Sequence, residues 1–212
     1  MKTYYYEGQM RSEEWLANTL KSVTRIARIK HTVRMIPCGC FHILDVGCGI
    51  GCLTNELAKK STMVTGIDML DSNLEIARAI KQQENAWYKK GNADKLCELG
   101  FEKESFNAIT ATELLEHLEN PVQFLKTCHE LLKKDGILVI STPNSVSPTN
   151  ILINYIKSNR DVQTEKKIAG VETDHLCEYS IRTLTRLMNH CGFKVLKFKY
   201  TKYSIVLKAK KS

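Results

Sequence analysis

Apolar and polar residues alternate along this chain with two different periods, and the change of period divides it. Over residues 11–36 apolar side chains recur every three or four positions with arginines and lysines between them, which predicts an amphipathic helix. Pro37 and Gly39 end that helix. Beyond them, short apolar runs of strand length alternate with helical segments. Such alternation predicts a parallel sheet with helices on both faces.

The alternating region predicts five successive strands, at 43–46, 63–67, 87–88, 106–111 and 136–141. Helices are expected at 52–60 and 71–83, and a third begins after Asn120. Asn120 is placed to cap that helix and Pro121 occupies its first turn, where the fixed φ of proline suits a helix start.

The C-terminal part breaks the alternation. Ser180 starts a helix that ends at Cys191 and Gly192, and two strands at 193–200 and 204–209 follow with a short turn between them. A parallel crossover needs about a dozen residues, so the last strand must run antiparallel to its neighbour. The expected fold is α/β: a Rossmann-like, seven-stranded, mostly parallel sheet with an antiparallel last strand and helices on both faces.

The length of 212 residues suits one domain. Within it, residues 1–37 are interpreted as an N-terminal helical lid. Residues 143–175 hold two prolines, several Asn and Ser, and an amphipathic segment at 151–156. An insertion after the carboxyl end of a strand lies over the ligand crevice of such a sheet, so this segment is interpreted as a substrate cap.

Composition excludes several classes of protein. The hydrophobic fraction of 43% and charged fraction of 25% are ordinary for a globular chain, which argues against disordered or fibrous proteins. Apolar runs are too short to cross a bilayer and no segment resembles a signal peptide, so we expect a cytoplasmic protein without an integral membrane segment. The eight cysteines are then expected to be free thiols.

The net charge of +8 is the one unusual property. A basic protein is suited to meet RNA, an anionic substrate or an acidic membrane surface. The lysines and arginines are spread along the chain, however, and the charge balance alone does not identify a partner. A small-molecule substrate is favoured, RNA is the alternative, and both a monomer and a homodimer remain open.

A glycine-rich loop at 45–51 follows the first strand of the alternating region and precedes a helix. Its glycines let the backbone turn sharply and approach a ligand closely. The spacing is GxGxG rather than the GxGxxG of dinucleotide enzymes. Asp45 stands two residues before the first glycine, and Asp68 ends the next strand, where a carboxylate can accept both hydroxyls of a ribose.

At these residues the chain resembles class I S-adenosylmethionine-dependent methyltransferases, from about His42 to the C-terminus. The resemblance implies S-adenosyl-L-methionine as cofactor. The residues that it assigns to the cofactor are Asp45, Gly47, Cys48, Gly49, Gly51, Asp68, Met69, Asn92, Ala93, Asp94, Thr112 and Glu113. It implies that the glycine loop lines the methionine and ribose, and that Asp45 supports this loop. It further implies that Asp68 binds the ribose diol, that Met69 packs on the adenine and that residues 92–94 read it.

The candidate catalytic residues follow the fourth strand. Glu113, Glu116 and His117 are spaced i, i+3 and i+4, so they share one face if this turn is helical. His117 is the candidate general base and Glu116 the residue that orients its ring, while His175 closes the cap. The alternative for His117 is a hydrogen bond to a loop carbonyl.

Two subfamilies are similar to this region. Residues 113–117 together with 141–144 resemble the ubiquinone-pathway O-methyltransferases, which act on catechol-like polyprenyl phenols. With residues 174–175 added, the same pieces resemble small-RNA 3′-terminal 2′-O-methyltransferases. That second resemblance implies a divalent metal (Mg, Mn or Zn) on Glu113, Glu116, His117 and His175.

The favoured function is therefore methyl transfer from S-adenosyl-L-methionine to an oxygen, or a nitrogen, of a small-molecule metabolite. The alternatives are an RNA 2′-O-methyltransferase with a divalent metal and a cofactor-binding protein without catalysis.

Overall fold

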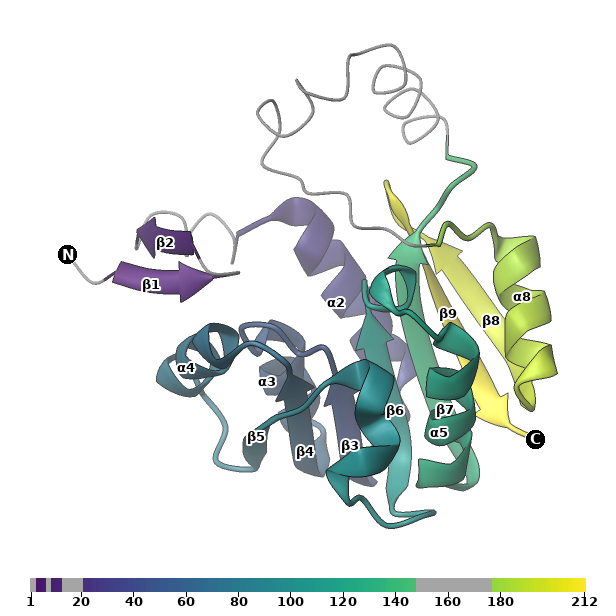
Figure 1. The fold of residues 1–212 in the computed structure, drawn as a ribbon, viewed down its shortest axis with the longest axis horizontal. Coiled ribbons are helices and arrows are strands. Elements are labelled where there is room, and N and C mark those ends of the chain that lie inside the picture. Colours follow the sequence, from purple (N-terminus) through teal and green to yellow (C-terminus); the bar gives the residue numbers. More distant parts are fainter. Residues whose placement is uncertain (1–2, 7–8, 13–20, 148–176) are drawn as a thin grey trace.

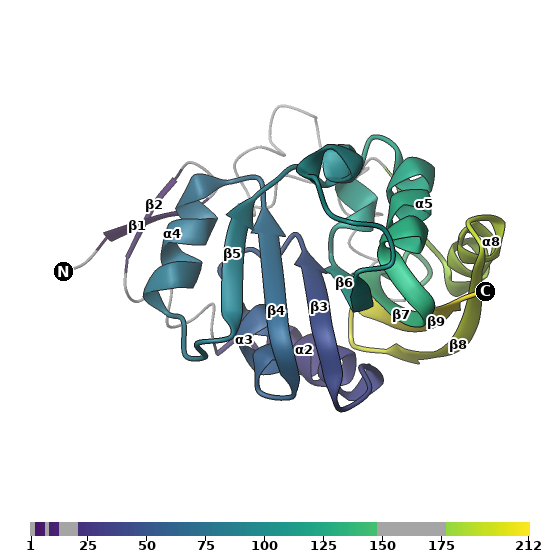
Figure 2. The same ribbon diagram turned by 90° about the horizontal axis from the view of Figure 1, so that it is seen from below.

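The computed structural model describes residues 3–6, 9–12, 21–147 and 177–212. Seven strands of this part form one sheet in the order β5-β4-β3-β6-β7-β9-β8 (Figures 1 and 2). The strands are β3 (Cys40–Val46), β4 (Ser61–Asp68), β5 (Ala86–Lys90), β6 (Phe106–Thr112), β7 (Leu132–Pro143), β8 (Phe193–Tyr200) and β9 (Ser204–Lys211). From β5 to β7 all neighbours are parallel, whereas β9 is antiparallel to both β7 and β8. The expected fold class is confirmed.

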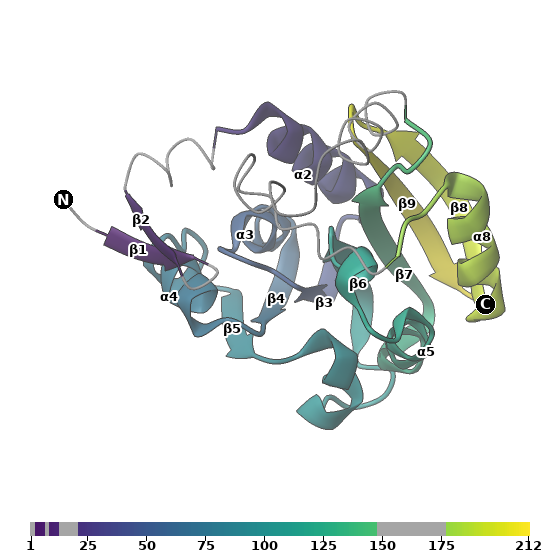
Figure 3. The same cartoon turned by 45° about the horizontal axis from the view of Figure 1, so that its top comes forward.

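Helices cover both faces of the sheet, as Figure 3 shows most clearly. The helices are α2 (Val23–Met35), α3 (Cys52–Ala58), α4 (Asp71–Ala79), α5 (Pro121–Leu131) and α8 (Ile181–His190), with the short 3-10 helices η1 (Ala93–Leu99) and η2 (Leu115–His117). Helices α2 and α3 pack on one face, α5 and α8 on the other, and α4 packs beside β5.

Two hydrophobic layers hold this arrangement together. The larger contains Phe124 and Leu125 of α5 and Leu184 of α8 packed against β3, β6, β7 and β9. The smaller contains Met35 of α2 and Leu57 of α3 on the opposite face. Because the inner strands are buried on both faces, their sequences are continuous apolar runs rather than alternating ones.

The N-terminal expectation was wrong at its beginning. The strands β1 (Thr3–Tyr6) and β2 (Gln9–Ser12) pair as a small antiparallel hairpin beside the main fold (Figure 1), so residues 11 and 12 are not helical. The helical periodicity was extended too far because a local strand pairing leaves no trace in it. Helix α2 begins at Val23 and ends within one residue of the expected position.

The remaining expectations concern the cysteines, membrane-spanning helices and the substrate cap. All eight cysteines are free thiols, as expected. No helix within the described ranges is both long and apolar enough to span a membrane. Of the expected cap, residues 143–147 are described, and the remainder, including His175 and the segment 151–156, lies outside the described residues.

Candidate active site

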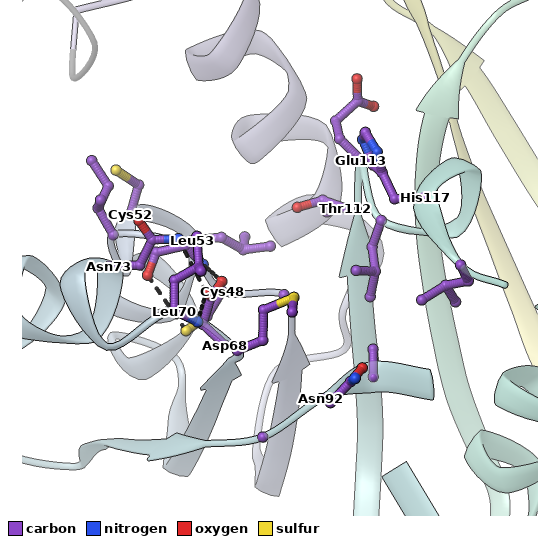
Figure 4. Close-up of a pocket in the computed structure, with 18 of the residues that line it drawn as sticks. Cys48, Cys52, Leu53, Asp68, Leu70, Asn73, Asn92, Thr112, Glu113 and His117 are labelled. Atoms are coloured by element: carbon purple, nitrogen blue, oxygen red, sulfur yellow. Dashed lines mark hydrogen bonds between the residues drawn. The ribbon is translucent and has the colours of Figure 1, made fainter. Parts of the chain in front are cut away.

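A cavity of about 690 Å³ opens at the carboxyl ends of β3, β4 and β6. Parallel sheets place ligands at this edge, because successive βα loops diverge there. Figure 4 shows its two sides: Cys48, Asp68 and Asn73 gather on one, and Thr112, Glu113 and His117 on the other. The sequence-predicted residues that line it are Gly47, Cys48, Gly49, Asp68, Met69, Asn92, Ala93, Asp94, Thr112, Glu113 and His117.

The glycine loop forms one wall of the cavity. Gly49 has a φ of +52°, in the left-handed region, and a Cβ added there would meet no atom within 4 Å. Backbone at this position is therefore open to a ligand, which glycine alone permits without strain. The loop is anchored below by the amide of Cys48, which donates to the carbonyl of Ile67 at 2.9 Å.

Asp68 ties this loop to the next one. Its Oδ2 accepts from the amide of Gly49 at 2.8 Å, and its Oδ1 accepts from the amide of Leu70 and from Nδ2 of Asn73, both at 3.0 Å. The carboxylate is 9% exposed and lines the cavity. Asp68 thus presents a fixed acceptor to the cavity while its donors hold the loop in place.

Two residues assigned to the cofactor do not line the cavity. Asp45 is fully enclosed and accepts from the hydroxyls of Thr54 and Thr110, each at 2.7 Å. Burial raises the pKa of Asp45 to about 6, against the effect of both hydrogen bonds. Gly51 caps α3 in the left-handed conformation, where a Cβ would lie 2.5 Å from the hydroxyl of Tyr88. Both residues support the loop from below rather than facing a ligand.

The segment after β5 forms another part of the cavity wall. Asn92 caps η1 by accepting from the amide of Asp94 at 2.9 Å. Oδ1 of Asp94 in turn accepts from the amides of Glu119 and Asn120, at 3.1 and 3.3 Å. Met69, which also lines the cavity, is 59% exposed. A flat ring bound against Met69 would cover this apolar side chain.

Glu113 follows β6 directly and has an unusual backbone conformation. Its φ of +52° is strained for a non-glycine residue and turns the chain out of the strand. Its Oε1 accepts from the hydroxyl of Ser141 at 2.9 Å, and its Oε2 from the hydroxyl of Ser204 at 3.2 Å. The guanidinium of Arg28, from α2, lies 3.5 Å from Oε2. A charged pair therefore stands at the cavity wall.

The expected common face of Glu113, Glu116 and His117 was wrong. The turn is helical only over η2, and Glu113 lies before it in a left-handed conformation. Glu113 and His117 line the cavity, but the side chain of Glu116 is 1% exposed and does not. Neither carboxyl oxygen of Glu116 makes a hydrogen bond within the described residues, so Glu116 does not orient the ring of His117. Burial, together with the Glu113 carboxylate, raises the pKa of Glu116 to about 8.

The divalent metal draws no support from this arrangement. In the described ranges, no group of three or more His, Cys, Asp or Glu side chains comes together as a metal site. Glu113 is held by Arg28 and two serines, Glu116 is buried away from the cavity, and His175 lies outside the described residues. The four-ligand site stays a prediction.

The sequence reasoning missed the contribution of α2. Arg25, Arg28 and Ile29 line the cavity from this helix, and Nη1 of Arg25 lies 4.0 Å from Sγ of Cys52. A usable signal was present, because residues 25, 28 and 29 share one helical face. Asn73 was also missed, although the first turn of a helix after Asp68 is well placed to brace that carboxylate.

The fold, the glycine loop and the acidic residue ending the next strand define a class I methyltransferase. A family described as "Methyltransferase domain" matches residues 11–197, and the chain belongs to this family.

Among its relatives, the ubiquinone biosynthesis O-methyltransferase of Coxiella burnetii is 39% identical over 119 residues, which cover 55% of this chain and 50% of that protein. The enzyme of the same name from Haemophilus ducreyi is 36% identical over 115 residues, covering 52% and 49%. The chain thus matches about half the length of these relatives.

Solved structures agree on the fold. An S-adenosylmethionine-dependent methyltransferase from Mesorhizobium loti superposes with a TM-score of 0.68 at 18% identity, covering 90% of this chain and 99% of that one. The magnesium protoporphyrin IX methyltransferase of Synechocystis, solved with S-adenosylhomocysteine bound, gives 0.64 at 16% identity, covering 92% and 83%.

Proposed function

We propose that this chain transfers the methyl group of S-adenosyl-L-methionine to an oxygen, or less favourably a nitrogen, of a small-molecule metabolite. The observation that carries the proposal is the cavity itself, in which an open glycine backbone and the Asp68 carboxylate face Glu113 and His117. The name shared by the two relatives supports oxygen as the methylated atom.

The residues present fit this cofactor. Asp68 offers an acceptor for the ribose diol, and the backbone at Gly49 leaves room beside it. Residues 92–94 and Met69 would enclose the adenine. The methionine tail is a zwitterion, and the cavity wall offers both charges that it needs: Arg28 for its carboxylate and Glu113 for its ammonium.

The cofactor supplies an electrophilic methyl group on a sulfonium. The protein must then hold the acceptor in line with it, exclude water and take up a proton. His117 lines the cavity and is the proposed base. Glu116, which does not line the cavity, and His175 stay predicted participants.

The test is transfer of tritium from methyl-labelled S-adenosylmethionine into an extract of the source cells, separated into organic, small-molecule aqueous and RNA fractions. We expect counts in the organic or aqueous fraction, and far fewer with Asp68→Ala at limiting S-adenosylmethionine, because this variant has lost its ribose acceptor. Counts confined to RNA would refute a small-molecule acceptor. Normal binding of S-adenosylhomocysteine with no transfer to any fraction would indicate a protein without catalysis.

A further inference from the structure

Two arginines of α2 reach the cavity, and they differ in their partners. Arg25 and Arg28 both line the cavity from one face of the helix, about 4.5 Å apart along its axis. The guanidinium of Arg28 lies 3.5 Å from the carboxylate of Glu113. Arg25 is only partly buried and forms no ion pair with any residue that the structure describes. Its side-chain contact is with Sγ of Cys52, 4.0 Å from Nη1.

The thiol of Cys52 does not neutralise Arg25. Burial raises the pKa of Cys52 above its usual range, although the nearby guanidinium of Arg25 acts to lower it. The thiol therefore stays uncharged at neutral pH, and an uncharged thiol is a weak hydrogen-bond acceptor. Arginine, in contrast, stays protonated throughout this range. Arg25 thus brings an uncompensated positive charge to the cavity wall.

The acidic side chains that line the cavity are held by other groups. Asp68 and Asp94 each accept hydrogen bonds from backbone amides. Glu113 is paired with Arg28 and accepts from two serine hydroxyls. None of these three carboxylates lies within ion-pair distance of Arg25.

The cofactor does not account for Arg25 either. In the proposed function its carboxylate is matched by Arg28 and its ammonium by Glu113. Figure 4 shows Cys52 across the cavity from Glu113, so Arg25, which contacts Cys52, meets a different side of the cavity from that pair. A charge inside a ligand cavity is costly unless it is paired, so an unpaired cation there indicates a negatively charged ligand.

We propose that Arg25 binds an anionic group of the methyl acceptor, a carboxylate or a phosphate, and so selects negatively charged metabolites. The planar guanidinium offers parallel N–H donors that match two oxygens of either group. This anionic group is separate from the atom that receives the methyl group. The inference rests on the proposed function, since it assigns the acceptor of the same reaction.

The experiment compares Arg25→Met with Arg34→Met, a control that removes the same charge from an exposed position in the last turn of α2. Tritium transfer from S-adenosylmethionine is measured in dilute extract after RNA has been removed, and the labelled product is passed over an anion-exchange resin at neutral pH. We expect the resin to retain the wild-type product. Its rate of formation should fall at least about tenfold in Arg25→Met and stay unchanged in Arg34→Met.

Two further measurements sharpen the assignment. The affinity of Arg25→Met for S-adenosylhomocysteine, measured by calorimetry, should stay within about twofold of the wild-type value. Arg25→Lys keeps the charge but loses the planar pair of donors, so it should retain more transfer than Arg25→Met. Treating the product with alkaline phosphatase distinguishes the two anions, because retention on the resin is lost for a phosphate and kept for a carboxylate.

The outcomes separate this inference from the proposed function. A labelled product that the resin does not retain would overturn the contact with an anionic acceptor, and so would undiminished transfer by Arg25→Met. Either result leaves the methyltransferase proposal intact. A loss of S-adenosylhomocysteine affinity in Arg25→Met as large as in Arg28→Met would assign Arg25 to the cofactor and would overturn the inference as well. A wild-type chain that labels no small-molecule fraction refutes the proposed function, and the acceptor contact with it.

Discussion

The buried carboxyl of Asp45 makes the stability of this protein depend on pH in an unusual direction. Folding raises its pKa from an ordinary 3.8 to about 6, chiefly through burial. Between these two values the folded state keeps a proton that the unfolded chain releases. The free energy of unfolding therefore falls as pH rises through this window, and the loss is complete above about pH 6.

The size of the effect follows from the two pKa values. A difference between about 6 and 3.8, at about 1.36 kcal/mol per pKa unit, corresponds to about 3 kcal/mol. Asp45→Asn removes the ionisation and keeps the shape. The hydroxyls of Thr54 and Thr110 can each rotate to donate to the amide oxygen or accept from the amide nitrogen. The stability of the variant relative to the wild-type chain should therefore rise by about 2.4 kcal/mol between pH 4 and pH 7, because part of the full change of about 3 kcal/mol is already lost at pH 4.

Urea unfolding followed by circular dichroism, on both chains at several values from pH 4 to pH 7.5, measures this difference. Comparing the two chains cancels the other titrating groups, which they share. A stability difference between the chains that stays constant across the range would refute the reasoning. A change of opposite sign would mean that Asp45 is stabilised as a carboxylate.

Three further predictions concern the cavity and its support. Asp68→Ala should weaken S-adenosylhomocysteine binding about 10- to 100-fold by calorimetry, since hydrogen bonds to a charged acceptor are lost; unchanged affinity would remove Asp68 from the site. Arg28→Met should weaken the same ligand about tenfold but leave 5′-methylthioadenosine, which lacks the carboxylate, unaffected; equal losses for both ligands would contradict a carboxylate contact. Gly51→Ala should cost about 2–4 kcal/mol in urea unfolding, because backbone strain adds to the clash with Tyr88. Gly39→Ala, with a similar φ but no neighbour within 4 Å, should cost only about 1–2 kcal/mol, and equal costs would rule out the clash.

The strands of the sheet could be predicted because each appears in the sequence as a short apolar run between helical segments. Buried parallel strands must be apolar throughout, and the short connection between 193–200 and 204–209 excludes a parallel crossover. The hairpin at β1 and β2 could not be predicted in the same way. It depends on pairing between two four-residue strands, and no amphipathic period accompanies such short segments.

Most residues that the motif assigned to the cofactor line the cavity, but the motif did not reveal which of them are buried beneath it. The motif placed Asp45 and Asp68 correctly at strand ends, yet Asp68 faces the cavity while Asp45 lies beneath it. Their difference arises from neighbours far along the chain, because the hydroxyl of Thr110, on β6, donates a hydrogen bond to one carboxylate oxygen of Asp45. A motif records which residues recur near a ligand, whereas tertiary packing decides which of them touch it.

The turn after β6 is a second case in which the sequence does not reveal how the side chains are packed. A helical spacing of Glu113, Glu116 and His117 assumes one continuous turn, but the left-handed φ of Glu113 interrupts it. That single dihedral directs Glu113 toward Arg28 and the cavity, while Glu116 turns into the interior beside Thr142. Two carboxyls three residues apart thus enter different environments. One lines the cavity, where a cation and hydroxyl donors hold it, and the other is buried and does not line the cavity. The chain therefore gives two neighbouring carboxyls of one motif different surroundings, which their spacing in the sequence does not reveal.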